Sequence, residues 1–168
     1  ADVINRLACA LRPKRTLLCA PTFADYEAGV KSVGSEVDHH VLDRANGFRV
    51  TEAFVERIVP GTEAVFICQP NNPTGLTCSR AVIQASLARC EEVGAHLVID
   101  ECFVGFLDDP ARVSVQGLLA DHPSLIVLKA FTKLYAMAGI RLGYALCADQ
   151  DLVASIQHTG QPWAVSSL

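Results

Sequence analysis

The sequence predicts an α/β fold in three layers, with helices on both faces of a mainly parallel β-sheet. Two observations carry this prediction. Strand-like apolar runs alternate with helix-like stretches along the whole chain, and such alternation is typical of parallel strands joined by right-handed crossovers. The 168 residues are 51% hydrophobic and rich in Val, Ile, Leu and Ala, a composition that suits strands buried on both faces. A chain of this length can form one full hydrophobic core.

The expected strands are short runs rich in β-branched and apolar residues. They cover residues 15–20, 36–42, 64–69, 95–101, 124–131 and 140–148. The expected helices lie before and between them, at residues 3–11, 23–33, 51–58, 79–93 and 150–158. The sequence shows no internal repeat and no linker, so we expect a single domain.

Charge and cysteine usage exclude several classes of function. The net charge of −4 is spread over interspersed signs, which argues against a nucleic-acid partner or an anionic membrane surface. The seven cysteines are odd in number and contain no Cys-x-x-Cys pair; we interpret them as reduced thiols in a cytoplasmic protein and expect no metal site. No apolar run is long enough to span a membrane, and the first residues do not resemble a signal peptide.

Lys133 is the first candidate for chemistry, because it lies between two apolar runs. We expect it near the interior, where lost hydration lowers the pKa of an amine and makes it a nucleophile toward carbonyls. Arg141 follows eight residues later in another apolar run, and a buried guanidinium needs an anion. Together they suit a phosphorylated carbonyl compound, of which pyridoxal phosphate is the common cofactor. The alternative is two ordinary surface side chains.

Polar side chains also follow two of the expected buried strands. Asn71 and Asn72 come after the run 64–69, and Asp100 lies at the end of the next. Open α/β sheets bind their ligands at the carboxyl ends of strands. A carboxylate there can hold a protonated pyridine nitrogen, although Asp100 can also be a helix N-cap. Glu101 points to the opposite side by strand alternation and is interpreted as structural.

Four motifs then stand in order: Pro-Asn-Asn-Pro-Thr-Gly at 70–75, Asp-Glu at 100–101, Thr-Lys at 132–133 and Gly-Ile-Arg-Leu-Gly-Tyr at 139–144. On these motifs the chain resembles, over essentially its whole length, the fold-type I pyridoxal-phosphate enzymes of the class I/II aminotransferase superfamily. More narrowly it resembles the histidinol-phosphate aminotransferases and the threonine-phosphate decarboxylases of cobalamin biosynthesis. The narrower likeness rests on residues 21–26, Phe103 and residues 161–165. Aminotransferases of the family usually carry Tyr at the position of Phe103.

The resemblance implies a role for each candidate residue. Lys133 forms the Schiff base and then acts as acid or base at the substrate Cα. Asp100 pairs with the ring nitrogen, and Asn72 donates to the phenolic oxygen after an Asn72–Pro73 bond that we expect to be cis. Phe23 stacks on the ring, its alternative being a core aromatic.

The phosphate ligands implied by the resemblance are Arg141 and Thr132. Ala130 stands where many relatives have a third, hydroxyl-bearing ligand, so this chain is expected to make fewer phosphate contacts. The family's sheet includes one antiparallel strand, and the run 140–148 is the candidate, because it returns directly from the strand that precedes Lys133.

The resulting hypothesis is a pyridoxal-phosphate-dependent enzyme core acting on a small, phosphorylated amino acid, most like threonine-phosphate decarboxylase. Three alternatives stay open: a histidinol-phosphate or aromatic aminotransferase, an inactive fragment that binds no cofactor tightly alone, and a Schiff-base or nucleotide-binding α/β protein without pyridoxal. Against the last, no Gly-x-Gly-x-x-Gly follows a strand. Relatives have an N-terminal arm, a Gly-rich phosphate turn and a C-terminal small domain that we expect this chain to lack. We expect the full-length protein to be a homodimer.

Overall fold

The computed structural model describes residues 2–161, and these contain one six-stranded sheet in the order β2-β1-β3-β4-β5-β6. The strands are β1 (Arg15–Ala20), β2 (Glu36–Val41), β3 (Ala64–Cys68), β4 (His96–Asp100), β5 (Leu125–Ala130) and β6 (Gly143–Cys147). Strands β1 to β5 are parallel, whereas β6 runs antiparallel to β5. The mainly parallel sheet and its antiparallel last strand are therefore confirmed.

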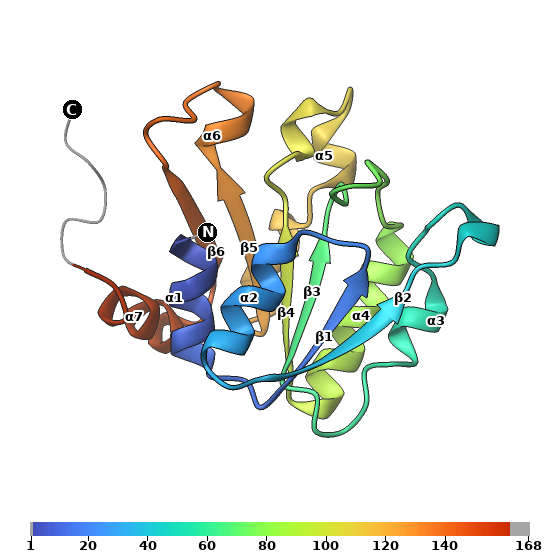
Figure 1. Ribbon diagram of the computed structural model, residues 1–168, viewed down its shortest axis with the longest axis horizontal. Coiled ribbons are helices and arrows are strands. Elements are labelled where there is room, and N and C mark those ends of the chain that lie inside the picture. Colours follow the sequence, from blue (N-terminus) through green and yellow to red (C-terminus); the bar gives the residue numbers. More distant parts are fainter. Residues whose placement is uncertain (1, 162–168) are drawn as a thin grey trace.

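Helices cover both faces of this sheet (Figure 1). One face carries α1 (Asp2–Leu11), α2 (Ala24–Ser32) and α7 (Gln150–His158), and the other carries α3 (Glu52–Val55) and α4 (Arg80–Val93). Two short helices, α5 (Pro110–Val113) and α6 (Phe131–Leu134), lie beyond the carboxyl ends of the strands. The three-layer arrangement is confirmed. None of the helices within residues 2–161 is long and apolar enough to cross a membrane.

Local sequence sets the ends of the longer helices. Ser79 caps α4 by accepting a hydrogen bond from the Val82 amide at 3.2 Å, and Gly94 ends it in a left-handed conformation with φ of 76°. A serine cap of this kind contributes about 1 kcal/mol, and glycine adopts positive φ without a Cβ clash. Asp149 caps α7 in the same way by accepting from the amides of Asp151 and Leu152.

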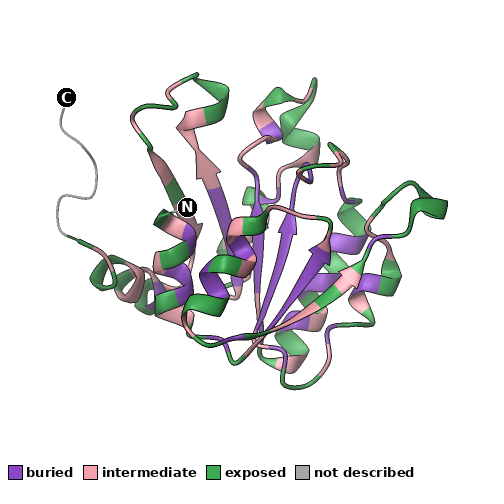
Figure 2. Ribbon diagram, in the orientation of Figure 1, coloured by how far each residue is buried: buried purple, intermediate pink, exposed green. Residues whose placement is uncertain are grey.

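The core divides into two clusters, one on each face of the sheet. All five residues of β3 are buried, as are most of β1, β4 and β5 (Figure 2). One cluster packs α1 and α2 against the sheet and includes Tyr26 and Phe66; the other packs α3 and α4 and includes Phe54. Because these central strands are buried on both faces, their near-continuous apolar sequence follows directly.

One expectation about local structure is wrong. The last strand begins at Gly143 rather than at residue 140, because the chain from Leu134 to Leu142 forms part of α6 and an irregular connection. Residues 108 and 109 lie in the loop before α5, where Asp109 caps the helix by accepting from the Arg112 amide at 3.2 Å, and Pro110 occupies the first turn, where its missing N–H costs nothing.

Buried thiols make this fold sensitive to alkaline pH. Burial raises the pKa of Cys90 from 9.0 to about 12, and it raises those of Cys19 and Cys78 to about 12 and that of Cys68 to about 11. The folded state keeps these protons at a pH where the unfolded chain has released them. Their stabilising contribution is therefore complete below the unfolded pKa of 9.0 and is lost as the pH rises toward the folded-state value.

We expect the free energy of unfolding to fall as the pH rises above 9.0, by roughly 1.4 kcal/mol per pH unit for each such thiol. Chemical denaturation at a series of alkaline pH values measures this slope. The Cys90→Ala variant should show a shallower slope, whereas Cys9→Ala, which removes an exposed thiol, should leave it unchanged. Identical slopes for the two variants would contradict the assignment.

Candidate active site

A cavity of about 140 Å³ opens at the carboxyl ends of β3, β4 and β5. Its walls come from segments that are far apart in the sequence, between α1 and the residues just before β6. Every residue singled out from the sequence as a cofactor ligand lines it: Phe23, Asn72, Asp100, Thr132, Lys133 and Arg141. Because parallel strands end at the same edge of a sheet, motifs that follow different strands converge here.

Asp100 is the buried carboxylate of this cavity, with 6% of its surface exposed. Its Oδ2 accepts a hydrogen bond from the Tyr26 hydroxyl at 2.7 Å, and its Oδ1 accepts one from the Cys102 amide at 2.9 Å. Burial, followed by the charge of Asp100, raises the pKa of the Tyr26 phenol, so Tyr26 remains a donor. Asp100 caps no helix, because the turn that follows it has Phe103 at its N-cap.

Aromatic rings line the same wall. Phe23 is the N-cap residue of α2 and meets Tyr26 edge to face, with centroids 5.5 Å apart. Tyr26 in turn stacks on Phe66 of β3 at 5.3 Å. Phe23 is half-buried and lines the cavity, so its ring is available to a planar ligand while its position is fixed by a buried neighbour.

The two asparagines after β3 have separate roles. The Asn71 amide donates to the Pro21 carbonyl and to the Thr74 hydroxyl, both at 3.1 Å, and its oxygen accepts from Thr22. Within residues 2–161, the Asn72 side chain makes no hydrogen bond to protein and lines the cavity. The Asn72–Pro73 bond is cis, as predicted.

The expected burial of Lys133 is wrong. The lysine lies on α6 and is exposed, because β5 ends at Ala130 and the following helical turn directs the side chain out of the sheet. Its Nζ lies 5.6 Å from the centroid of the Phe103 ring, within range of a cation–π contact. The amine nevertheless lines the cavity that also holds Asp100 and Asn72.

The expected burial of Arg141 is also wrong. Arg141 precedes β6, is exposed, and has a left-handed φ of 58°. Its guanidinium donates to the Ala138 carbonyl at 3.5 Å, and Arg141 is among the residues that line the cavity. Thr132 is half-buried and lines the same cavity, as does Ala130, which offers no hydroxyl.

Sequence reasoning missed Tyr26, Cys68 and Cys102, which line the cavity beside Asp100. Burial raises the pKa of both thiols, so they remain protonated and poorly nucleophilic. Tyr26 lies three residues after Phe23, in the segment 21–26 on which the narrower resemblance rests, but its partner Asp100 is 74 residues away. No local signal could have paired them.

A model of the family aminotransferase class I and II matches residues 1–168. The chain belongs to this family. Among curated class I and II relatives, it is 35% identical over 167 residues to threonine-phosphate decarboxylase of Salmonella typhimurium, covering 99% of this chain and 45% of that protein. It is 33% identical over 171 residues to histidinol-phosphate aminotransferase of Bacillus subtilis, covering 100% of this chain and 47% of that protein.

The family's fold is also evident among solved structures. The chain superposes on histidinol-phosphate aminotransferase from Clostridium acetobutylicum with a TM-score of 0.88 and 29% identity, covering 98% of this chain and 48% of that one. The chain thus spans about half the length of the class I and II aminotransferase relatives that it matches.

The residues of the cavity have the chemistry that a phosphorylated pyridine aldehyde requires. A buried carboxylate is available to a ring nitrogen, an amine to the aldehyde and an amide to a ring oxygen, while an arginine and a threonine are available to the phosphate. The donor set of this aminotransferase-family chain therefore fits pyridoxal phosphate.

Proposed function

We propose that this chain is the cofactor-binding core of a pyridoxal-phosphate-dependent enzyme acting on a phosphorylated amino acid. The observation that carries the proposal is the convergence of Asp100, Asn72, Lys133 and Arg141 on one cavity from four separate segments. Family membership and the two kinds of curated relative support it.

Each side chain then has a task defined by its position. Pyridoxal phosphate, when bound, supplies a carbonyl and a ring that accepts an electron pair. Asp100, held by Tyr26 and Cys102, keeps a proton on the ring nitrogen. Lys133 would hold the cofactor by condensation of Nζ with its carbonyl carbon, which releases the carbonyl oxygen as water, and would move a proton at the substrate Cα.

The remaining ligands hold the cofactor in place. Asn72 would donate to the ring oxygen and Phe23 would cover one ring face. Arg141 would bind the phosphate with its guanidinium, and Thr132 would add a hydroxyl donor. Ala130 adds none, so the phosphate depends on these two side chains more heavily than it would with a third ligand.

We propose decarboxylation as the reaction, with threonine phosphate as the substrate class. The bond from Cα to the carboxylate breaks, carbon dioxide leaves, and a proton takes its place on Cα, so there is no net oxidation. Phe103 lines the cavity without a hydroxyl, which removes one hydrogen bond that would favour amino-group transfer. Histidinol-phosphate or aromatic transamination is the alternative, and the Bacillus subtilis relative is consistent with it.

Incubation of the full-length protein with threonine phosphate tests the reaction type. We expect carbon dioxide and aminopropanol phosphate. Transfer of the amino group to 2-oxoglutarate without carbon dioxide would place the protein among the aminotransferases. Residues 162–165, part of the segment that favoured decarboxylation in the sequence, lie outside the described residues.

The catalytic unit that we propose is longer than this chain. Its relatives are about twice as long, and we propose that the phosphate-binding Gly-rich turn and the groups that orient the substrate carboxylate belong to other parts of the protein. We further propose a cytoplasmic homodimer that serves cobalamin biosynthesis. Titration of the 168-residue chain with pyridoxal phosphate, followed by absorption, shows whether the core binds cofactor alone; a folded chain with no binding supports the alternative of an inactive fragment.

A further inference from the structure

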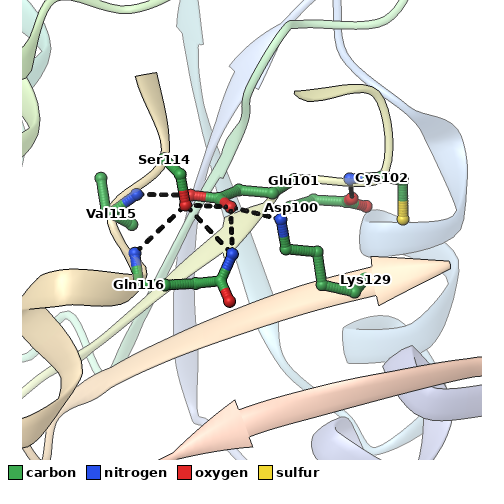
Figure 3. A network of polar contacts seen from close by, with 7 residues as sticks. All are labelled: Asp100, Glu101, Cys102, Ser114, Val115, Gln116 and Lys129. Atoms are coloured by element: carbon green, nitrogen blue, oxygen red, sulfur yellow. Dashed lines mark hydrogen bonds and ion pairs between the residues drawn. The ribbon is translucent and has the colours of Figure 1, made fainter. Parts of the chain in front are cut away.

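Glu101 is a buried carboxylate for which the proposed chemistry has no use. Its side chain is fully buried and points away from that of its neighbour Asp100, toward α5 and β5 (Figure 3). An isolated buried charge is strongly unfavourable unless it is paired and hydrogen-bonded. The residues around Glu101 must therefore supply its hydrogen bonds and an opposite charge.

Three strong partners meet this carboxylate. Oε1 accepts from the Val115 amide at 2.6 Å, while Oε2 accepts from the Ser114 hydroxyl at 2.8 Å and pairs with Lys129 Nζ at 2.7 Å (Figure 3). The Lys129 side chain is itself only 14% exposed. The carboxylate is thus fully satisfied by a network that joins the residue after β4 to β5 and to the residues after α5.

These contacts close a loop that forms part of the cavity wall. Glu101 begins the connection from β4, and Ser114 and Val115 end the segment that contains α5. One carboxylate therefore joins both ends of residues 101–115 and fastens them to β5. Cys102 and Phe103, which line the cavity, lie inside this closed segment.

The network also reaches Asp100 through one peptide group. The amide that donates to Asp100 Oδ1 belongs to Cys102, so it is part of the peptide that follows Glu101. The Glu101 amide donates to the Leu128 carbonyl at 2.9 Å, and its side chain is held at three points. The Glu101 Cα, from which this peptide starts, is therefore held both by the backbone bond to β5 and by the side-chain contacts.

We infer that Glu101 is a positioning residue: by closing the segment 101–115 onto β5, it holds the Cys102 amide against Asp100 and so fixes the carboxylate that faces the cofactor ring. This inference rests on the proposed function. It gives the two adjacent acids at the end of β4 different tasks: Asp100, the last residue of the strand, faces the ligand, and Glu101, the residue after it, holds Asp100 in place from the other side.

The Glu101→Gln variant of the full-length protein tests the inference. The amide keeps the shape of the side chain but leaves Lys129 without its partner carboxylate. We expect cofactor binding to weaken roughly fivefold to tenfold, on the scale of one lost hydrogen bond. We also expect the pH midpoint of the bound cofactor's absorption change to move lower, because a displaced Asp100 stabilises the protonated ring less.

Two further variants separate positioning from general stability. Ser114→Ala removes one contact to Glu101 but leaves the ion pair with Lys129, so the variant should fold. Its cofactor affinity and spectral pH midpoint should both fall, but by less than in Glu101→Gln. Thr16→Val removes a buried hydroxyl that bonds Ser35 at 2.8 Å near the amino end of β1. It should lower thermal stability but leave both the cofactor affinity and the spectral midpoint unchanged.

The outcomes are distinguishable. The inference is supported if cofactor affinity and the pH midpoint of the absorption change are both lowered in Glu101→Gln and Ser114→Ala and are both unchanged in Thr16→Val. A wild-type spectrum and affinity in folded Glu101→Gln would overturn the role of Glu101 while leaving the proposed function intact. Failure of the wild-type protein to bind pyridoxal phosphate at Lys133 would overturn both.

Discussion

Replacing Lys133 with alanine is expected to abolish the borohydride-trapped cofactor adduct and to lower turnover of the full-length protein by at least about 10⁴, the upper scale for losing a proton-transferring group. Lys133 is the amine that lines the cavity with Asp100 and Asn72. Among the described residues that line this cavity, no other side chain carries an amine that could replace both its bond to a carbonyl and its proton transfer. Mass mapping after borohydride treatment locates the adduct, and steady-state assays measure turnover.

The chain offers a clear control for this experiment. It has four lysines, Lys14, Lys31, Lys129 and Lys133. Lys31 lies on α2, pairs with Glu27 and is exposed, so Lys31→Ala should keep both the adduct at Lys133 and full turnover. An adduct that persists at another lysine in Lys133→Ala, with turnover retained, would refute the assignment.

The fold was predictable because its signals are long. Each strand of the parallel sheet is a run of apolar residues, and each longer helix fills the interval to the next strand, so alternation alone gives the layers and their order of appearance. The four-residue helices α5 and α6 gave no such signal, since a single turn is too short for a 3.6-residue period to show. Their absence from the prediction explains why Lys133 was expected inside rather than on an exposed turn.

For the candidate site, the sequence could predict only which residues meet at the carboxyl ends of the strands. Asn72 follows β3 and Asp100 ends the neighbouring parallel strand β4, so their meeting at one edge follows from the topology. Strand alternation likewise placed Glu101 on the side opposite Asp100. Neither argument could supply the partners themselves: Tyr26 reaches Asp100 across 74 residues, and Ser114 reaches Glu101 from the end of a loop. Such contacts depend on helix placement and loop closure, which no local pattern encodes.

Asp100→Asn tests the ring-nitrogen partner with little change in shape. We expect the full-length variant to fold. Asp100 accepts from the Tyr26 hydroxyl and the Cys102 amide; an asparagine can still accept from one of these donors, and its own amide can donate to the hydroxyl oxygen. Turnover should nevertheless fall on the order of 10² or more, the scale of a lost electrostatic contact in a buried site. A neutral amide cannot hold a proton on the ring nitrogen, so the ring accepts electrons from Cα less well.

The control is a carboxylate of similar type but remote from the cavity. Asp38 on β2 pairs with Arg15 at the outer edge of the sheet, so Asp38→Asn should affect stability slightly and turnover not at all. Thermal unfolding, cofactor titration and steady-state turnover are measured for both variants. The fall in turnover that we expect depends on the charge of Asp100 and not on its shape. Near-normal turnover by a folded, cofactor-loaded Asp100→Asn protein would therefore show that Asp100 serves only the turn it forms with Cys102.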